Sequence, residues 1–581
     1  MLTNIHFGTA ALSNKLVLDR AHHPHFGSIT VYLVGDILGS VDNNGLINHD
    51  KKTVDNHICD LIMNSDDLAR ISLLSFVGSF SLIVILHNTN DLFALVSCTC
   101  PNPYVFAKGN RIFIEFDENK LLKDYADRLS LKSIINISLS HQLVVRYPTQ
   151  LFDLSKIIRC PSGHITHLSN TFSRVNFYSY LNNFQHAFSS SRLRNSLVSI
   201  LSLYHQKYGS DLGLLFSGGL DSSCLASTLK SSNIPLPFFH IDYKGDISLR
   251  SCVAAYISSF FESPTRHIPR FSNAVQADEV LRQCRAGLMT VPNPMYFGVP
   301  INSTSVEHLP KYLITGQGAD SIYVIDGFAP PTESIGTQRI NQILRSAPDR
   351  LALCESYIFK QLDYHNPIID SSLLSSSTFT DFVNKQCCDL LEHVDYKEYT
   401  PNLKKTFVTR ERLDLIAKPV LSLLQSYIQS SNSSVSISSV YRYIKWMRSL
   451  INCPQQDASA LLSQSVQRLT PYLEGPIVGL FFGYKLREME SISIKHELES
   501  LFEYQSGVSH RRLVEVAITQ TPSPVNCGEK IYTSASKKYV ENVQSQVLES
   551  LINDYKSSPR YHSLSDYIQD ITQLVRIAPF I

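Results

Sequence analysis

Short apolar runs separated by turn-forming residues fill the first 180 positions of the chain. The turns are rich in Gly, Asn, Asp and Pro, and the runs cover 28–34, 80–86, 91–96, 104–106, 112–114 and 142–146. Runs of this length, rich in Val, Ile and Phe, are typical of strands in antiparallel sheets packed face to face. The pattern therefore predicts an antiparallel β-sandwich over residues 1–185.

The pattern changes after residue 190, where helical and strand-like segments begin to alternate. Helical apolar spacing is found at 193–204, 249–261 and 274–286, and the residues after 223 also read as a helix. Strand-like runs are those ending at Phe216 and those at 237–241, 266–268 and 311–315. Strands separated by helices predict a parallel sheet, whose ligands bind at the carboxyl ends of its strands.

The pattern beyond about residue 330 is mostly helical. The fold class predicted is therefore α+β and α/β. An antiparallel sandwich over 1–185 is followed by a parallel-sheet unit over 190–581 with a mostly helical C-terminal part.

Composition narrows the range of partners. The 581 residues carry 52 basic and 51 acidic side chains without a basic block, which argues against nucleic acid as a partner.

The location of the protein is indicated by its cysteines and its apolar segments. The 12 cysteines form no C-x-x-C pair and are typical of a reducing compartment. The first residues do not resemble a signal peptide, and the near-apolar run 73–86 is too short to span a membrane. We expect a cytoplasmic protein.

The candidate chemistry begins at Ser217–Ser223, with the sequence SGGLDSS between a predicted strand and a predicted helix. Glycines let the backbone approach an anion, and N–H groups at the start of a helix face it. Asp221 would repel a phosphate unless Mg²⁺ lay between them. The loop lacks the Lys of a Walker A motif, so an ordinary ATPase or GTPase is not indicated. The residues therefore predict a site for a nucleotide with a bound metal ion.

A second small-residue turn follows the predicted strand 311–315, with the sequence TGQGAD over Thr315–Asp320. The carboxyl ends of parallel strands share one edge, so this turn should meet the first. Asp320 and Asp221 would then supply two acids from separate segments to one Mg²⁺.

The SGGLDSS loop resembles the PP-loop of ATP pyrophosphatases, in the version found in asparagine synthetases. The turn at 315–320, the segment Arg468–Leu473 and a segment ending at Lys530 also resemble that family. The resemblance implies cleavage of ATP between its α and β phosphates. It implies nucleotide binding by Leu215, Ser217, Gly218, Gly219, Asp221, Ser222, Ser223, Ile241 and Gly316, metal binding by Asp221 and Asp320, and catalytic roles for Lys530, Gln317 and Asp320.

The N-terminal unit is similar to the glutaminase domain of the same family, at Tyr32–Asp36, Phe76–Phe80 and Pro161–His164. In that family the nucleophile is a Cys exposed by removal of Met. Leu2 stands here, so we expect a degenerate glutaminase-like domain that shields or docks.

Two departures concern the substrate: Gln317 and Ser321 stand where asparagine synthetases carry Glu, or usually do. Gln317 argues against asparagine synthesis from ammonia. A degenerate N-terminal domain on a synthetase domain resembles the cyclases of lasso-peptide biosynthesis. The resemblance implies that an Asp or Glu side chain of a precursor peptide is adenylated and joined to the peptide's own N-terminal amine. It also implies a leader peptidase and a leader-binding protein as partners.

Three other functions stay open at this point. A β-lactam-synthetase-like cyclisation of a small amino acid would use the same residues. A tRNA-modifying PP-loop enzyme is disfavoured by the neutral charge. A non-catalytic nucleotide-binding scaffold is favoured by the missing acids at Gln317 and Ser321, and disfavoured by the intact loop.

Overall fold

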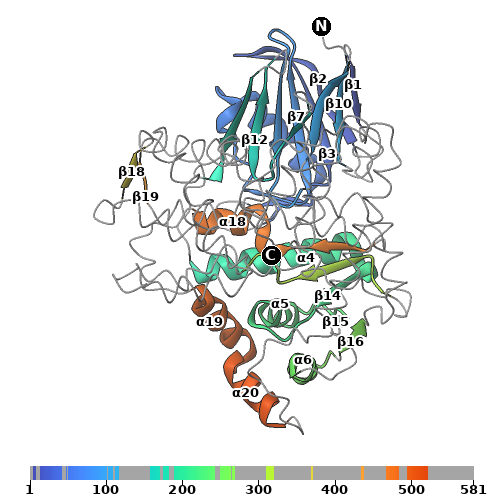
Figure 1. Cartoon of the computed structure of the whole chain (residues 1–581), viewed down its shortest axis with the longest axis vertical. Coiled ribbons are helices and arrows are strands. Elements are labelled where there is room, and N and C mark those ends of the chain that lie inside the picture. Colours follow the sequence, from blue (N-terminus) through green and yellow to red (C-terminus); the bar gives the residue numbers. More distant parts are fainter. Residues whose placement is uncertain are drawn as a thin grey trace, which may run out of the picture.

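The chain forms a mixed α/β structure with an antiparallel part and a parallel part (Figure 1). The computed structural model describes residues 4–7, 14–41, 47–48, 50–100, 103–108, 111–116, 157–169, 174–181, 189–241, 249–263, 265–268, 309–319, 368–370, 434–436, 466–482 and 494–520. The predicted strand at 142–146 and the predicted helix at 274–286 lie outside these residues.

A six-stranded antiparallel sheet forms the larger layer of the N-terminal part. Its order is β13 (Val175–Ser179), β12 (His164–Leu168), β8 (Asp91–Val96), β7 (Phe80–Leu86), β3 (Gly27–Gly35) and β2 (Asn14–His23). The strands predicted at 28–34, 80–86 and 91–96 are confirmed as β3, β7 and β8. Strand β2 was not predicted, because its sequence mixes charged residues with apolar ones.

Four strands form a second layer: β1 (Asn4–Phe7), β10 (Arg111–Glu115), β9 (Tyr104–Lys108) and β11 (Ile157–Arg159). Its pairings are antiparallel except that of β1 with β10. Ile83 and Val96 of the larger sheet share one buried cluster with Val105 and Ile112 of this layer. The two sheets therefore pack face to face.

Strand β7 shows why the larger sheet reads as continuous apolar runs. Ile83 faces the four-stranded layer, whereas Leu82 and Val84 belong to a second buried cluster on the opposite face. Successive side chains of a strand point to opposite faces, so a sheet covered on both sides needs apolar residues at every position.

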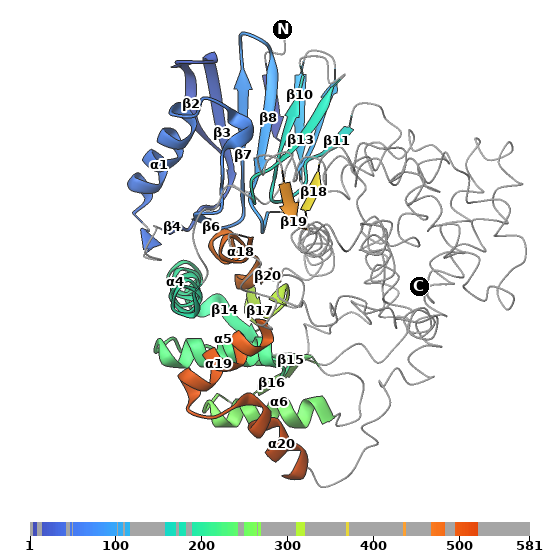
Figure 2. The same ribbon diagram turned by 90° about the vertical axis from the view of Figure 1, so that its left-hand side faces the viewer.

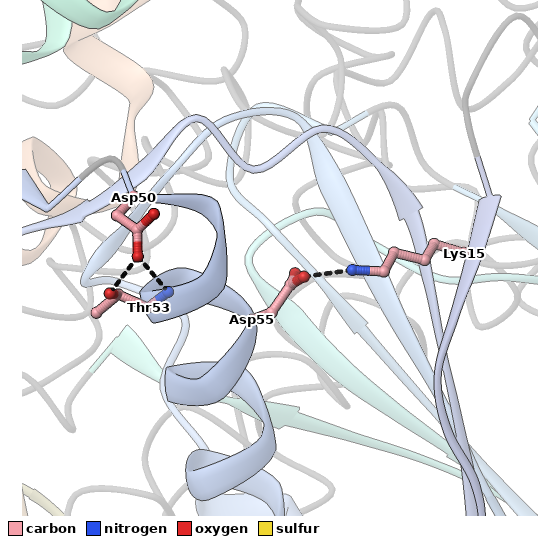
Figure 3. Close-up of polar contacts among 4 residues, drawn as sticks. All are labelled: Lys15, Asp50, Thr53 and Asp55. Atoms are coloured by element: carbon pink, nitrogen blue, oxygen red, sulfur yellow. Dashed lines mark hydrogen bonds and ion pairs between the residues drawn. The ribbon is translucent and has the colours of Figure 1, made fainter.

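Helix α1 (Lys51–Met63) packs beside β2 and contributes Val54, Ile58 and Ile62 to the second cluster. Its N-cap is Asp50, whose carboxylate accepts hydrogen bonds from the backbone N–H of Thr53 at 3.0 Å and from its hydroxyl at 2.6 Å (Figure 3). Asp55 of the helix pairs with Lys15 of β2 at the surface (Figure 3). Such a cap stabilises a helix by about 1 kcal/mol. The exposed ion pair contributes less to stability.

The smaller elements of this part are listed by their bounds. They are a three-stranded sheet of β5 (Ile47–Asn48), β4 (Gly39–Val41) and β6 (Phe76–Val77), and the 3-10 turn η1 (Leu68–Arg70).

A five-stranded sheet, parallel throughout, forms the second part. Its order is β16 (Thr265–Ile268), β15 (Phe238–Ile241), β14 (Leu212–Leu215), β17 (Tyr312–Thr315) and β20 (Gln467–Leu469). Its helices are α4 (Ser190–Tyr208), α5 (Leu220–Ser231), α6 (Leu249–Phe260), α18 (Gly475–Phe482), α19 (Ile494–Ser506) and α20 (His510–Gln520). The parallel sheet and the helices expected at 193–204 and 249–261 are thus confirmed.

Most of the C-terminal region predicted to be helical lies outside the described residues. Its described elements, besides β20 and helices α18 to α20, are the paired strands β18 (Ile368–Asp370) and β19 (Ser434–Ser436) and the 3-10 turn η7 (Pro471–Leu473). A further 3-10 turn, η4 (Gly209–Asp211), follows α4.

Helices α4 and α18 lie between the antiparallel sheets and the parallel sheet (Figure 2). The second buried cluster is continuous across this boundary, since it contains Leu74 and Phe76 from one side, Tyr204 of α4, and Leu214 and Ile477 from the other. The two parts therefore share a hydrophobic core. Within the described ranges, no helix has both the length and the apolar character needed to cross a membrane.

Candidate nucleotide-binding site

The SGGLDSS loop lies where the order of the parallel sheet reverses. The chain runs outward from β14 through β15 to β16, and then returns to the other side of β14 to add β17 and β20. The first strand therefore has neighbours whose connections leave in opposite directions. In open α/β sheets the crevice at such a point, outside the carboxyl ends of the strands, is where ligands bind.

The two adjacent glycines of the loop differ in backbone conformation and in the space around them. Gly218 has φ of +74°, and a Cβ there would lie 2.9 Å from the Ala254 backbone of α6. Gly219 is extended, with φ of −72° and ψ of 160°, and is the N-cap of α5. Among the described residues, a Cβ on Gly219 would approach only the Ser217 hydroxyl, at 3.3 Å. The fold requires Gly218, whereas Gly219 leaves space beside the start of the helix.

The three serines of the loop have different environments. The Ser222 hydroxyl donates to the Gly219 carbonyl at 3.0 Å and accepts from the Ser217 N–H at 3.3 Å, so it holds the loop together. Ser217 is exposed. The Ser223 hydroxyl is fully buried and has no hydrogen-bond partner in the described part of the chain. Such a group is costly to bury unless an ordered water or a ligand oxygen completes it.

The turn after β17 is in direct contact with this loop. Strands β14 and β17 are neighbours, with Leu215 opposite Thr315 at their carboxyl ends. A Cβ on Gly316 would lie 2.9 Å from the Cβ of Asp221 and 3.0 Å from the backbone nitrogen of Ser222. The absence of a side chain at Gly316 is what lets the two turns touch. The expected meeting of the turns is therefore observed for Gly316 and Asp221.

Of the other predicted site residues, Leu215, Ile241 and Gln317 are described by the structure and two are not. Leu215 and Ile241 end strands β14 and β15 at the same edge of the sheet. The side-chain oxygen of Gln317 accepts a hydrogen bond from Nη1 of Arg468 at 3.3 Å, so this amide is held by β20. Asp320 and Lys530 lie outside the described residues, and their predicted roles stay predictions.

Two side chains support the loop in a way that the sequence did not indicate. Nε2 of His510, at the start of α20, donates to the Gly218 carbonyl at 3.0 Å. Burial lowers the pKa of His510, which favours the neutral ring. The Tyr472 hydroxyl donates to the Asp221 carbonyl at 3.0 Å. Both side chains come from distant segments, 292 and 251 positions away in the sequence from the residues they contact.

The loop fits a Mg²⁺ ion that is shared with phosphates. Asp221 offers one carboxylate in the first turn of α5. Within the described residues there is no group of three or more His, Cys, Asp or Glu side chains that could hold a metal. Mg²⁺ is often bound by one or two carboxylates together with substrate phosphates, so the donor set agrees with that mode.

The N-terminal part offers no activated thiol among its described residues. Burial raises the pKa of Cys98, Cys100 and Cys160 to about 12, and it also raises the pKa of Cys59. A cysteine nucleophile needs a thiolate and therefore a lowered pKa. Cys98, Cys100 and Cys160 belong to the buried hydrophobic clusters and are packing residues.

Comparison with known proteins adds no family assignment. A scan against protein-family models finds no match, and a search of curated proteins finds no significant match. The functional interpretation therefore rests on the motifs and on the geometry of the two turns.

Proposed function

We propose that this protein is an ATP-dependent amide-forming ligase that releases AMP and pyrophosphate, and that it belongs to the asparagine synthetase-like PP-loop enzymes. The observation that carries the proposal is the contact between the SGGLDSS loop and the Gly316 turn at the switch point of a parallel sheet. In this proposal the antiparallel part is a degenerate glutaminase-like domain.

The residues of the loop suit the triphosphate of ATP. The space beside Gly219 and the positive end of the α5 dipole favour phosphate oxygens. The Ser223 hydroxyl is the buried donor that lacks a partner. Mg²⁺, when bound beside Asp221, would neutralise charge on the departing pyrophosphate. Because Tyr472, His510 and Ala254 already fix the backbone of the loop, little reorganisation is needed on binding.

The reaction solves a leaving-group problem. A carboxylate does not form an amide with an amine at neutral pH, because oxide would have to leave. A carboxylate oxygen instead attacks the α phosphorus of ATP, and the bond from that phosphorus to the β-bridging oxygen breaks, so pyrophosphate leaves with the electron pair. The amine nitrogen then attacks the acyl carbon, the bond from carbon to the AMP oxygen breaks, and the amine loses a proton.

We propose that the carboxylate is an Asp or Glu side chain of a precursor peptide and that the amine is the N-terminus of the same peptide, as in lasso-peptide macrolactam formation. The unactivated thiols of the described N-terminal residues support an amine that comes with the substrate rather than from glutamine. The enzyme would hold amine and acyl group together and exclude water. A leader peptidase and a leader-binding protein in the cytoplasm would be its partners. A β-lactam-synthetase-like reaction on a small amino acid differs only in the acceptor.

One observation favours a second candidate, a non-catalytic nucleotide-binding scaffold. Gln317, at the position facing the acyl substrate in the related enzymes, is already engaged by Arg468. A scaffold would bind ATP without consuming it.

Product analysis separates these functions. The purified protein is incubated with Mg-ATP and candidate acceptors, either processed precursor peptides or small amino acids, with Asp221→Ala as the control. AMP and pyrophosphate that depend on a processed peptide and disappear in Asp221→Ala are the expected result. AMP formed with a small amino acid selects the small-molecule cyclase. ADP and phosphate, or no turnover with any acceptor, would overturn the ligase proposal.

A further inference from the structure

Three consecutive side chains link the two parts of the molecule to the loop. These are the side chains of Tyr472, Leu473 and Glu474, which together with Pro471 form the 471–474 turn. Tyr472 donates its hydroxyl hydrogen bond to the carbonyl of Asp221. Leu473 packs against Gly318, where a Cβ would lie 2.5 Å from the Leu473 side chain. Glu474 reaches the antiparallel part. One short turn thus contacts both halves of the candidate site and the N-terminal unit.

The contacts of Glu474 are specific and buried. Its side chain is 3% exposed. Oε2 accepts from the backbone N–H of Gly78 at 2.9 Å, and Oε1 accepts from the Tyr204 hydroxyl of α4 at 2.5 Å. These two residues lie 396 and 270 positions away in the sequence. Each oxygen of this buried carboxyl group has a hydrogen-bond partner, so the contact fixes a position rather than merely filling space.

The turn that receives Glu474 is itself rigid. Gly78 has φ of +130°, and its carbonyl accepts hydrogen bonds from the hydroxyls of Ser97 and Thr99, each at 3.0 Å. Next to Glu474, a Cβ on Gly475 would lie 2.9 Å from the carbonyl oxygens of Leu74 and Phe76. The backbones of the two parts therefore meet at Gly475 without intervening side chains.

The ionisable groups around Glu474 are themselves weak acids. Tyr204 and Tyr208 come from α4, and Cys98 follows β8; each interacts electrostatically with Glu474. Burial raises the pKa of Glu474 to about 7, despite the hydrogen bonds from Tyr204 and Gly78. A neutral amide could make both hydrogen bonds, because its oxygen accepts from Gly78 and its NH₂ donates to the Tyr204 oxygen.

We propose that Glu474 is a positioning residue, through which the N-terminal part holds the SGGLDSS loop in its binding geometry. The path runs from Gly78 through Glu474 and Tyr472 to the Asp221 carbonyl. The N-terminal part is then a required support of the site, whether or not it performs chemistry of its own. The effect on ATP rests on the proposed function, but the effect on the loop does not.

Hydrogen–deuterium exchange of the full chain tests the path directly. Two peptides are followed, one covering 214–224 and one covering 74–82, in wild type, Glu474→Ala and Glu474→Gln. Glu474→Ala should speed exchange in both peptides by roughly tenfold, since local opening becomes easier by the worth of the two lost hydrogen bonds. Glu474→Gln should restore near wild-type exchange. Unchanged exchange at 214–224 in a folded Glu474→Ala protein overturns the proposal.

Two further variants keep the test decisive if Glu474→Ala does not fold. Tyr472→Phe removes only the hydroxyl that reaches Asp221, so it should speed exchange at 214–224 and leave 74–82 unchanged. Lys207→Ala removes a half-exposed ion pair with Asp36 across the same boundary and should change neither peptide. Fast exchange at 214–224 in Lys207→Ala, or slow exchange there in Tyr472→Phe, contradicts the path.

The kinetics separate this proposal from the proposed function. In an active enzyme, Tyr472→Phe should raise KM for ATP by roughly three- to tenfold with a smaller change in kcat, because the loop binds phosphate less well. If wild type consumes no ATP but exchange follows the predicted pattern, the ligase proposal fails and the positioning role stands. If ATP is consumed and exchange does not respond, the positioning role fails alone.

Discussion

The two parts of the molecule place their reactive side chains in opposite environments. In the antiparallel part, Cys98, Cys100 and Cys160 are buried and their thiols stay protonated. At the edge of the parallel sheet, Ser217 is exposed and Asp221 is partly exposed, while a rigid backbone holds both. The same chain thus buries polar groups as packing in one part and leaves them accessible at the sheet edge in the other. Of these two described environments, the second is the one proposed to carry chemistry.

Thiol labelling gives the largest expected contrast. A pKa of about 12 in place of the ordinary 9.0 leaves roughly a thousandfold less thiolate at neutral pH, and burial slows access further. Alkylation followed by peptide mass spectrometry at pH 7.5 should leave Cys98, Cys100 and Cys160 unmodified in the native protein and modify them in denaturant. Rapid labelling of any of these cysteines in the native protein would show that its thiol is not buried and protonated as described.

Alanine at the two loop glycines sharpens the second half of the comparison. Gly218→Ala meets both a positive φ and the Ala254 backbone, so the free energy of unfolding should fall by roughly 2–4 kcal/mol. Gly219→Ala meets neither, and the Ser217 hydroxyl 3.3 Å from the new methyl group belongs to an exposed side chain that can move, so this variant should unfold almost like wild type in urea. Equal losses in the two variants would mean that the loop is not held as described.

The pH dependence of stability tests the burial of Glu474 at the boundary between the two parts. The pKa of Glu474 is raised from 4.5 to about 7 by burial. Between these values the folded chain keeps a proton that the unfolded chain has released, so rising pH lowers the free energy of unfolding, by roughly 3 kcal/mol in all, with no further loss above about pH 7.

The amide of Glu474→Gln does not titrate in this range, so this variant should not show the fall in the free energy of unfolding. Urea denaturation at pH 5 and pH 8 of both proteins gives the comparison, in which His510 and His164 titrate alike and cancel. If wild type and Glu474→Gln lose the same stability between these pH values, Glu474 is not buried as described.

Ser223→Ala has the smallest expected effect. Without a ligand, removing a buried hydroxyl that has no partner in the described structure should leave the protein as stable as wild type or about 1 kcal/mol more stable. With Mg-ATP the lost donor should weaken binding by about fivefold. Calorimetric titration of both proteins measures this, and equal affinities would remove Ser223 from the site.

The sequence predicted what depends on local pattern. Strands β3, β7 and β8 are apolar on both faces, and β14 leads into a glycine-rich loop and helix α5, so their positions follow from neighbouring residues. The contact of Gly316 with Asp221 followed from the rule that parallel strands end at one edge. The bonds of Glu474 and His510 to glycine backbones could not be predicted, because each joins positions hundreds of residues apart and leaves no local pattern. Lys530 and Asp320 remain predictions.

Thermal unfolding with and without Mg-ATP tests, without any acceptor, the claim that the loop between β14 and α5 binds the phosphates of ATP. Mg-ATP at about 100 times its Kd should stabilise wild type by about 2.7 kcal/mol. Gly219→Ala, equally stable alone, should gain much less, because its methyl group occupies the space beside the helix start. No stabilisation of wild type, or equal stabilisation of both proteins, would contradict the claim.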